Sequence, residues 1–203
     1  MNIAPSDLAW RDAYKLMVGS ILPRPIAFVS TLDEEGVSNL APFSFFAPIC
    51  ASPMMICFAP MLRGTDGVKK DTLRNIEATK QFVVNIVSEK LAGQVNECAT
   101  EYASDVDEFE AAGLTKVPSE KVHAFRVLES QIHMECELHE VLSFGDQAGA
   151  GHLVIGKVVY MHVNDEVYDN GKIDTVKLEP IGRMAGAEYS RASTDTFILE
   201  RKK

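Results

Sequence analysis

The residues best suited to bind a ligand lie in two neighbouring blocks of the sequence. One block contains the cations Arg63 and Lys70 and the hydroxyl of Thr72, at the expected start of a helix. A helix N-terminus offers unpaired N–H groups and the positive end of the helix dipole, which favour an anion such as phosphate. Asp71 opposes an anion here, and it either caps the helix or orients Lys70. The alternative is an ordinary solvated helix face, where most lysines and arginines lie.

The other block, residues 24–46, combines backbone polar groups with aromatic side chains. Pro42 and Pro48 are expected to keep this backbone out of regular sheet pairing, which leaves N–H and C=O groups open to a ligand. Together the two blocks suit a ligand with a flat polar ring at one end and a phosphate at the other. The candidate ring contacts are Ser30, Thr31, Asn39, Pro42, Ser44, Phe45 and Phe46. Asn39 either contacts the ligand or holds a hairpin, and Phe43 is more simply explained as a core aromatic.

Composition limits the partners and the compartment. The chain has 203 residues, enough for one domain with a sizeable core, and we expect a single domain over residues 1–203. Its net charge of −9 argues against nucleic acid and anionic membranes as partners. No apolar run approaches the length of a membrane helix, and no secretory signal is visible, so a cytoplasmic protein is expected. The four cysteines form no Cys-x-x-Cys pair and are expected to be buried free thiols.

The pattern of apolar residues predicts many short strands and few helices. We expect helices over residues 6–17, 68–79, 89–99 and 105–112, strands over 26–31, 53–59, 81–88, 132–139 and 152–163, and turns at 33–36 and 169–171. The first helix would be capped by Ser6 or Asp7, and the second by Thr65 or Asp66. This order indicates a β-barrel decorated by helices.

Residues 132–139 alternate between apolar and polar side chains, which predicts a half-buried strand. The polar face carries His133, Glu135, Glu137 and His139. Neighbours on one face of a strand lie about 7 Å apart. A row of four cannot close a tetrahedral site, so no metal is expected here.

Seven segments of the chain, taken in order, resemble the flavin reductase-like family of FMN-binding split barrels. They are RPIAFVST (24–31), SNLAPFSFF (38–46), KDTLRNI (70–76), QFVVNIV (81–87), ESQIHMECEL (129–138), GHLVIGKVVYMHV (151–163) and EPIGRMAGAEY (179–189). The resemblance implies a mainly β fold, a six-stranded Greek-key split barrel with a few helices. It also implies a homodimer with FMN at or near the interface.

The resemblance further implies roles for individual residues. Arg63, Lys70, Asp71 and Thr72 would surround the FMN phosphate. Arg183 and Tyr189 fall in the segment that resembles the loop covering the flavin, often from the partner subunit, although Arg183 could equally pair with a carboxylate. His152 would contact nicotinamide, and the alternative is an ordinary exposed histidine at the start of a strand. The family commonly reads Gly-Asp-His at this point, whereas Gly151 directly precedes His152 in this chain.

The function implied is an FMN-dependent NAD(P)H oxidoreductase that passes electrons to free flavin, a metal complex or a partner protein. No Gly-x-Gly-x-x-Gly motif is present, so nicotinamide would bind over the exposed flavin face. The alternatives are a flavoredoxin-type electron carrier reduced by another protein and a flavin-binding module without turnover. The sequence does not decide between FMN and FAD as the cofactor, or between NADH and NADPH as the electron donor.

Overall fold

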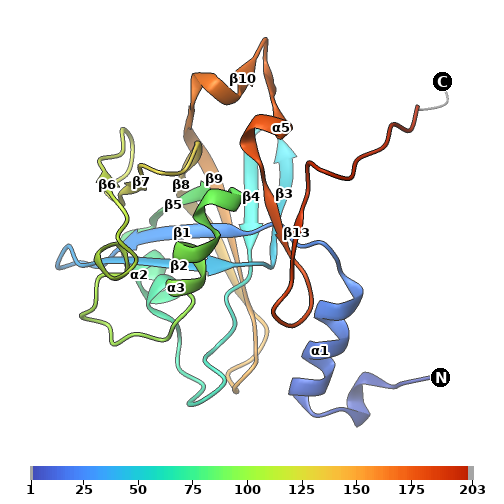
Figure 1. Ribbon diagram of the computed structural model, residues 1–203. Helices are drawn as coiled ribbons and strands as arrows, with labels where there is room; N and C mark the ends of the chain where they lie inside the picture. The colour runs from blue at the N-terminus through green and yellow to red at the C-terminus, as the bar shows by residue number, and fades with distance from the viewer. Residues whose placement is uncertain (1, 201–203) are drawn as a thin grey trace.

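The computed structural model describes residues 2–200, and one antiparallel sheet forms its body (Figure 1). The sheet has seven strands in the order β2-β1-β5-β8-β9-β4-β3. Their bounds are β1 Ala27–Leu32, β2 Ser38–Phe43, β3 Phe46–Ala51, β4 Met54–Phe58, β5 Gln81–Ile86, β8 Ile132–Ser143 and β9 His152–Val163. Three two-stranded ribbons complete the strands: β6 Lys116–Val117 with β7 Arg126–Val127, β10 Tyr168–Asp169 with β11 Lys172–Ile173, and β12 Ile181–Arg183 with β13 Tyr189–Arg191.

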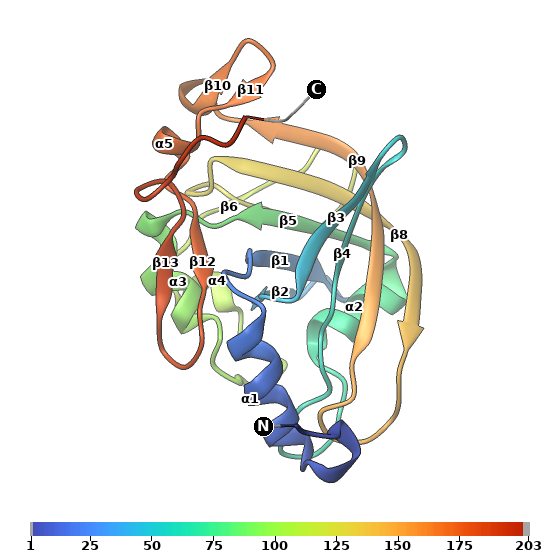
Figure 2. The same ribbon diagram turned by 90° about the vertical axis from the view of Figure 1, so that its right-hand side faces the viewer.

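The connection between β2 and β3 forces this sheet to curl. The two strands lie at opposite edges of the sheet, yet only Ser44 and Phe45 join them. Across a flat sheet of seven strands those edges would be about 29 Å apart. The chain from Phe43 to Phe46 spans at most about 11 Å. The edges must therefore approach each other, and Figure 2 shows the barrel that results.

Helices close the barrel from its ends and sides. The α-helices are α1 Trp10–Ser20, α2 Asp71–Thr79, α3 Ala92–Glu97, α4 Glu108–Ala111 and α5 Thr175–Leu178, and the 3-10 turns are η1 Pro5–Asp7, η2 Glu89–Leu91 and η3 Asp165–Val167. Across residues 2–200, no helix combines the length and the apolar character needed to cross a membrane.

Strand β1 separates two apolar cores. Ala27 and Val29 face the barrel interior, where Leu73 and Ile76 of α2 pack against them. Phe28 faces the other way, toward α3 and α4. Because both faces of β1 are covered, five of its six residues are buried, including the polar Ser30 and Thr31.

The predicted mainly β barrel is confirmed, and several boundaries differ from the prediction. The helix expected over 6–17 begins at Trp10 without a side-chain cap, after a 3-10 turn. The helix expected from residue 68 begins at Asp71, because Asp66 instead accepts a hydrogen bond from the Val68 amide in a turn. The helix expected over 89–99 divides into η2 and α3, and the one over 105–112 shortens to α4.

Two predictions about the strands were wrong. Pro42 does not interrupt pairing, since it lies in β2 opposite Phe28. Pro48 lies in β3 opposite Ile56, but the pairing of β3 with β4 shifts its register directly after Pro48, as the prediction of irregular pairing implies. Both strands are sheet edges, where a missing N–H can be tolerated. Strand β3 was not predicted, and with it the sheet described here has seven strands where six were expected.

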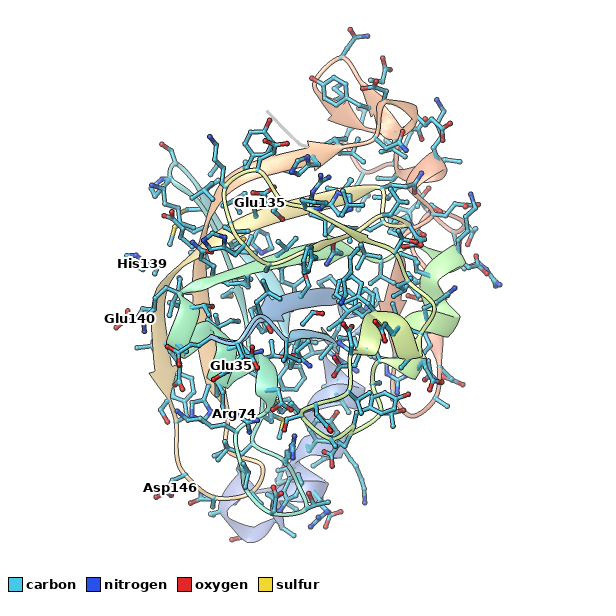
Figure 3. The ribbon with its side chains drawn as sticks, turned by 90° about the vertical axis from the view of Figure 1, so that its left-hand side faces the viewer. Glu35, Arg74, Glu135, His139, Glu140 and Asp146 are labelled. Atoms are coloured by element: carbon cyan, nitrogen blue, oxygen red, sulfur yellow. The ribbon has the colours of Figure 1, made fainter. Side chains whose placement is uncertain are left out.

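Strand β8 is not half-buried in the alternating way that its sequence predicts. His133 and Glu135 are buried, whereas His139 and Glu140 lie at the surface (Figure 3). Irregular pairing with β9 at 135/136 and 138/140 breaks the period of two. Glu135 accepts hydrogen bonds from the amides of Glu120 and Lys121, which anchor a loop over the strand. Among the described residues, no three metal-binding side chains come together.

The four cysteines carry free thiols, and two of them match the prediction of burial. Cys98 and Cys136 are buried, and burial raises the pKa of the Cys98 thiol to about 12. Cys57 is half-buried. Cys50 is exposed, contrary to the prediction, because it lies on the edge strand β3.

The close contact between Gly156 of β9 and Phe82 gives a stability prediction. A Cβ at Gly156 would lie 2.4 Å from the fully buried Phe82 ring. We expect Gly156→Ala to lower the free energy of unfolding by about 1–3 kcal/mol, because the packed core cannot absorb the methyl group. Gly93→Ala is the control, since nothing lies within 4 Å of its Cβ position and the helix should gain up to about 1 kcal/mol. Urea denaturation measures the free energy of unfolding of both variants. Equal values for Gly156→Ala and Gly93→Ala would contradict the packing argument.

Candidate functional site

Three adjoining pockets form one groove along the seam where β2 and β3 part. We call them the anion pocket, the middle pocket and the apolar pocket, with volumes of about 140, 150 and 230 Å³. The anion and middle pockets share Pro42 and Lys70. The middle and apolar pockets share Ser44 and Phe45. A long ligand could therefore occupy all three.

The N-terminus of α2 contributes unpaired amides to the anion pocket. Lys70 precedes the helix with an extended backbone and provides no side-chain cap. The amides of Leu73 and Arg74 donate to the Lys70 carbonyl at 3.0 and 3.2 Å. Within residues 2–200 the amides of Asp71 and Thr72 have no hydrogen-bond acceptor. Both residues line the pocket, so two backbone donors and the helix dipole are available to an anion.

The side chain of Lys70 adds an unpaired positive charge. It lines both the anion and the middle pocket, and no carboxylate in the described chain pairs with its ammonium. The ammonium lies 5.8 Å from the centre of the Phe43 ring. Burial lowers the pKa of Lys70, and the charge of Glu101 opposes that shift. The adjacent Lys69 differs, because its ammonium holds the Glu77 carboxylate at 2.7 Å.

Asp71 is paired rather than left facing the pocket alone. Its carboxylate accepts from Arg63 at 3.0 Å and also from Arg74. It therefore neither caps α2 nor orients Lys70, the two roles considered from sequence. It holds Arg63 at the pocket wall, and two guanidinium groups offset its charge.

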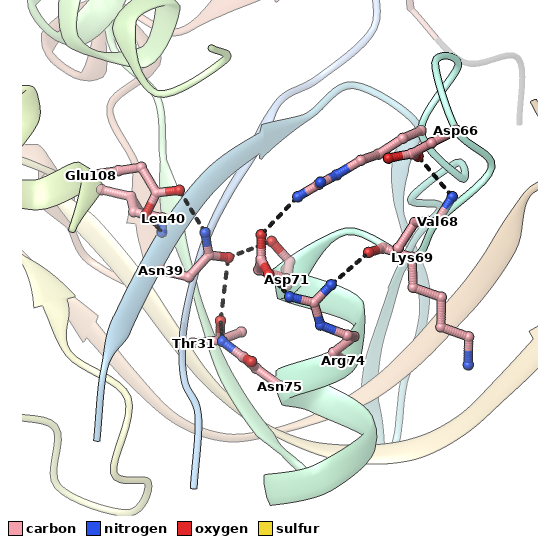
Figure 4. Close-up of polar contacts among 12 residues, drawn as sticks. Thr31, Asn39, Leu40, Asp66, Val68, Lys69, Asp71, Arg74, Asn75 and Glu108 are labelled. Atoms are coloured by element: carbon pink, nitrogen blue, oxygen red, sulfur yellow. Dashed lines mark hydrogen bonds and ion pairs between the residues drawn. The ribbon is translucent and has the colours of Figure 1, made fainter. Parts of the chain in front are cut away.

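A buried hydrogen-bond network supports the floor of the anion pocket (Figure 4). Asn39 is its centre: the Asn39 amide NH₂ donates to Glu108 at 2.7 Å, and its carbonyl accepts from the Thr72 hydroxyl at 2.7 Å. Thr31 donates to the same carbonyl at 3.5 Å and accepts from Asn75 at 3.1 Å. The network joins β1, β2, α2 and α4, so Asn39 both lines the pocket and ties the surrounding elements together.

The middle and apolar pockets follow the two residues that connect the sheet edges. The amides of Ser44 and Phe45 donate to no acceptor in residues 2–200, because they lie between the paired strands. The Phe45 ring approaches Tyr14 of α1, with 6.3 Å between ring centres. The apolar pocket is lined by Met17, Ile21, Pro23, Arg24, Pro25, Ser44, Phe45 and Phe46. This end therefore offers flat apolar walls beside backbone donors.

Arg24 joins the segments that surround the apolar pocket. Its buried guanidinium donates to the carbonyls of Val18 and Ile21 at 2.6 and 3.1 Å and to that of Met184 at 3.0 Å. It also approaches the Ser44 hydroxyl at 3.4 Å. Through these contacts α1, the seam and the β12–β13 hairpin are held in one arrangement.

The structure brings most of the predicted site residues together. Asn39, Pro42, Ser44, Phe45, Phe46, Arg63, Lys70, Asp71 and Thr72 line the groove. Ser30 does not, because it is fully buried and its hydroxyl donates to the Phe125 carbonyl at 2.5 Å. Thr31 supports Asn39 from behind the pocket wall.

Three further candidates lie outside the groove of this single chain. His152 is 4 % exposed, its Nε2 lies 3.3 Å from the Ser143 hydroxyl, and burial lowers its pKa. Arg183 stacks on the Tyr189 ring at 4.5 Å and donates to the Gly186 carbonyl at 2.6 Å. Neither Arg183 nor Tyr189 lines any of the three pockets, and Arg183 forms no ion pair within the described chain.

Comparison with known proteins agrees with this architecture. The family model for the flavin reductase like domain matches residues 18–177. The chain belongs to the flavin reductase-like family. Nitrilotriacetate monooxygenase component B from Bacillus cereus is 38% identical, with a TM-score of 0.92 and 98% of each chain covered. The Pseudomonas fluorescens 2-nitrobenzoate 2-nitroreductase NbaA is 32% identical, with a TM-score of 0.89 over 100% of this chain and 96% of its own.

A third solved structure supports the fold of this flavin reductase-like protein. A Shewanella frigidimarina protein with a flavin reductase split barrel domain is 22% identical, with a TM-score of 0.82, and the match covers 99% of this chain and 100% of that one. The barrel described above is thus a split barrel, as expected from the sequence segments.

Several residues of the groove were missed by the sequence analysis. The groove is also lined by Tyr14, Arg24, Cys98–Tyr102 and Glu108. Only Arg24 carried a local signal, since it stands between two prolines that hold it in extended backbone. Glu108 is held at the pocket by hydrogen bonds from Asn39 and Leu40, which lie 69 and 68 residues before it in the sequence. No local pattern reveals such distant pairing.

Replacing Arg24 tests its role in holding the hairpin. We expect Arg24→Ala to destabilise the protein by about 1–3 kcal/mol, because buried carbonyls lose their donors. Amide hydrogen exchange at residues 183–189 should become faster, since the Met184 contact is lost. Arg191→Ala is the control on the same hairpin: its partner Glu89 is solvent-exposed, and little change is expected. Unchanged exchange in Arg24→Ala would contradict the assignment.

Proposed function

We propose that this protein binds FMN along the seam groove and passes electrons from NAD(P)H to an acceptor. The observation that carries the proposal is the order of chemistry along the groove. An unpaired ammonium and two unpaired helix amides lie at one end, and aromatic walls with unpaired seam amides lie at the other. This order matches a phosphate joined to a flat polar ring.

The residues present fit each part of that ligand. Lys70, Arg63 and the amides of Asp71 and Thr72 would hold the phosphate. The amides of Ser44 and Phe45 would donate to the polar edge of the ring, while Phe45 and Phe46 pack against its apolar part. Bound flavin would supply the hydride chemistry, and the chain would supply binding, orientation and electrostatics. Donors along the seam would stabilise the negative charge that a reduced ring carries.

We also propose that two copies of the chain form a homodimer, and that the second copy completes the site. In this single chain the apolar pocket is bordered by exposed apolar side chains, including Met17 and Ile21 of α1. Strand β3 is an edge whose residues from Ala47 onward are exposed. A second copy would cover these surfaces and could bring Arg183, Tyr189 and His152 of the two chains nearer to bound flavin.

Lys70→Ala tests the phosphate assignment. Loss of a charged hydrogen bond costs about 1.5–3 kcal/mol, so the Kd for FMN should rise roughly 10- to 100-fold. Lys70→Ala/Thr72→Ala should weaken binding further, because a polar pocket wall becomes apolar. Lys69→Ala is the matched control, because its ammonium is held by Glu77. Riboflavin, which lacks the phosphate, should bind both single variants alike. Unchanged FMN affinity in the double variant would refute the assignment.

The direct test of electron transfer is anaerobic reduction. FMN-loaded protein is mixed with NADH or NADPH in a stopped-flow instrument, and flavin absorbance is followed. Fast bleaching is expected with at least one donor and gives the nicotinamide preference. Tight FMN binding without bleaching would instead indicate a carrier reduced by a protein, as in the flavoredoxin alternative. Failure to bind any flavin would overturn the proposed function as a whole.

A further inference from the structure

The direction of the hydrogen bonds beneath the anion pocket is fixed by one carboxylate. Glu108 is 7 % exposed, and its two oxygens accept from the Asn39 NH₂ at 2.7 Å and from the Leu40 amide at 3.0 Å. An ionised carboxylate can only accept hydrogen bonds. The side of Asn39 that faces Glu108 must therefore be its NH₂, and the carbonyl must face Thr72.

This orientation determines what Thr72 can offer a ligand. The Thr72 hydroxyl has one proton, and that proton is donated to the Asn39 carbonyl at 2.7 Å. Among residues 2–200, the only other donor to that carbonyl is Thr31, at 3.5 Å. Turning the Thr72 proton toward a ligand would leave the partly buried Asn39 carbonyl poorly paired, which is unfavourable. The hydroxyl oxygen thus meets the pocket as an acceptor.

Other acceptors share the pocket wall with its cations. The lining includes the carboxylates of Asp71, Glu101 and Glu108 beside Arg63 and Lys70. A fully ionised anion has no proton to give these oxygens. A phosphate monoester whose charge is −1 carries one P–OH group, and that group can donate to an acceptor.

We propose that Glu108 is a positioning residue which, through Asn39, makes Thr72 a hydrogen-bond acceptor, so that the anion pocket selects a phosphate monoester that keeps one proton. The inference rests on the proposed function, since FMN is the phosphate monoester in question. It adds that the pocket discriminates between protonation states of the phosphate and disfavours sulfate, which carries no proton near neutral pH.

Several charged and titratable side chains lie near Glu108. Asp107 caps α4 directly before Glu108 and pairs with Lys116. Asp71, the first residue of α2, pairs with Arg63. The charge of Glu101 acts on Lys70, and both line the pocket together with Cys98 and Tyr102. Burial raises the pKa of the Glu108 carboxyl, and Asp107 adds to the shift. The phosphate loses its second proton near pH 6.

The test is the pH dependence of FMN binding to the whole protein. For the wild type we expect the Kd to rise about tenfold per pH unit above pH 6, as the singly charged phosphate disappears. Inorganic phosphate should compete with FMN at pH 6 at least about tenfold better than sulfate does.

Glu108→Gln should reverse this preference without changing the size of the side chain. The Gln carbonyl must accept from the Leu40 amide, so its NH₂ faces Asn39 and turns that side chain over. Thr72 then accepts from Asn39 and donates to the ligand. The variant should bind FMN at least as well at pH 8 as at pH 6, and the advantage of phosphate over sulfate should fall to about one.

Glu101→Gln is the matched control, because it removes the same charge from the same pocket but contacts neither Asn39 nor Thr72. It should strengthen FMN binding at each pH while keeping the wild-type slope. Equal slopes in wild type and Glu108→Gln, or wild-type affinity that does not fall above pH 6, would overturn the inference. Wild-type protein that binds no FMN at any pH would instead refute the proposed function. Thermal melting of each apo variant checks that it is folded.

Discussion

The two-residue connection between β2 and β3 is the constraint on which the rest of this structure depends. These strands are neighbours in sequence but lie at opposite edges of the seven-stranded sheet. Ser44 and Phe45 can join them only if the sheet curls until its edges nearly meet. Curling encloses the apolar side of β1, β5 and β9, and α2 fills the interior with Leu73 and Ile76. The core and the seam are thus two results of the same short connection.

The candidate site follows from where this closure is incomplete. Edges that approach without pairing leave backbone groups without partners, which is unfavourable unless water or a ligand satisfies them. Along the seam these groups are the amides of Ser44 and Phe45, and the α2 N-terminus adds those of Asp71 and Thr72. A split in a barrel is therefore a natural place for a long ligand with polar groups at both ends.

Local patterns in the sequence predicted the parts of the fold that local physics decides. Strand β9 was predicted at its observed bounds, because it is a long run rich in β-branched residues that ends at turn signals. The start of α2 was missed, since Lys70 precedes it in extended backbone and no side chain caps it. Strand β3 was missed because Pro48 argues against a central strand, and only the tertiary structure makes it an edge. The pairing of Asn39 with Glu108 spans 69 residues and has no local signature.

The charge of the protein adds a last constraint on how an anion could bind. With a net charge of −9, the distant field repels a phosphate rather than attracting it. In the anion pocket the carboxylates of Asp71, Glu101 and Glu108 outnumber the cations Arg63 and Lys70. Binding must then depend on short-range contacts: oriented amides, one unpaired ammonium and hydrogen bonds of defined direction. Such contacts act within a few ångströms and are screened by salt much less than distant charges are. Selectivity in this pocket is therefore a matter of donor and acceptor geometry more than of total charge.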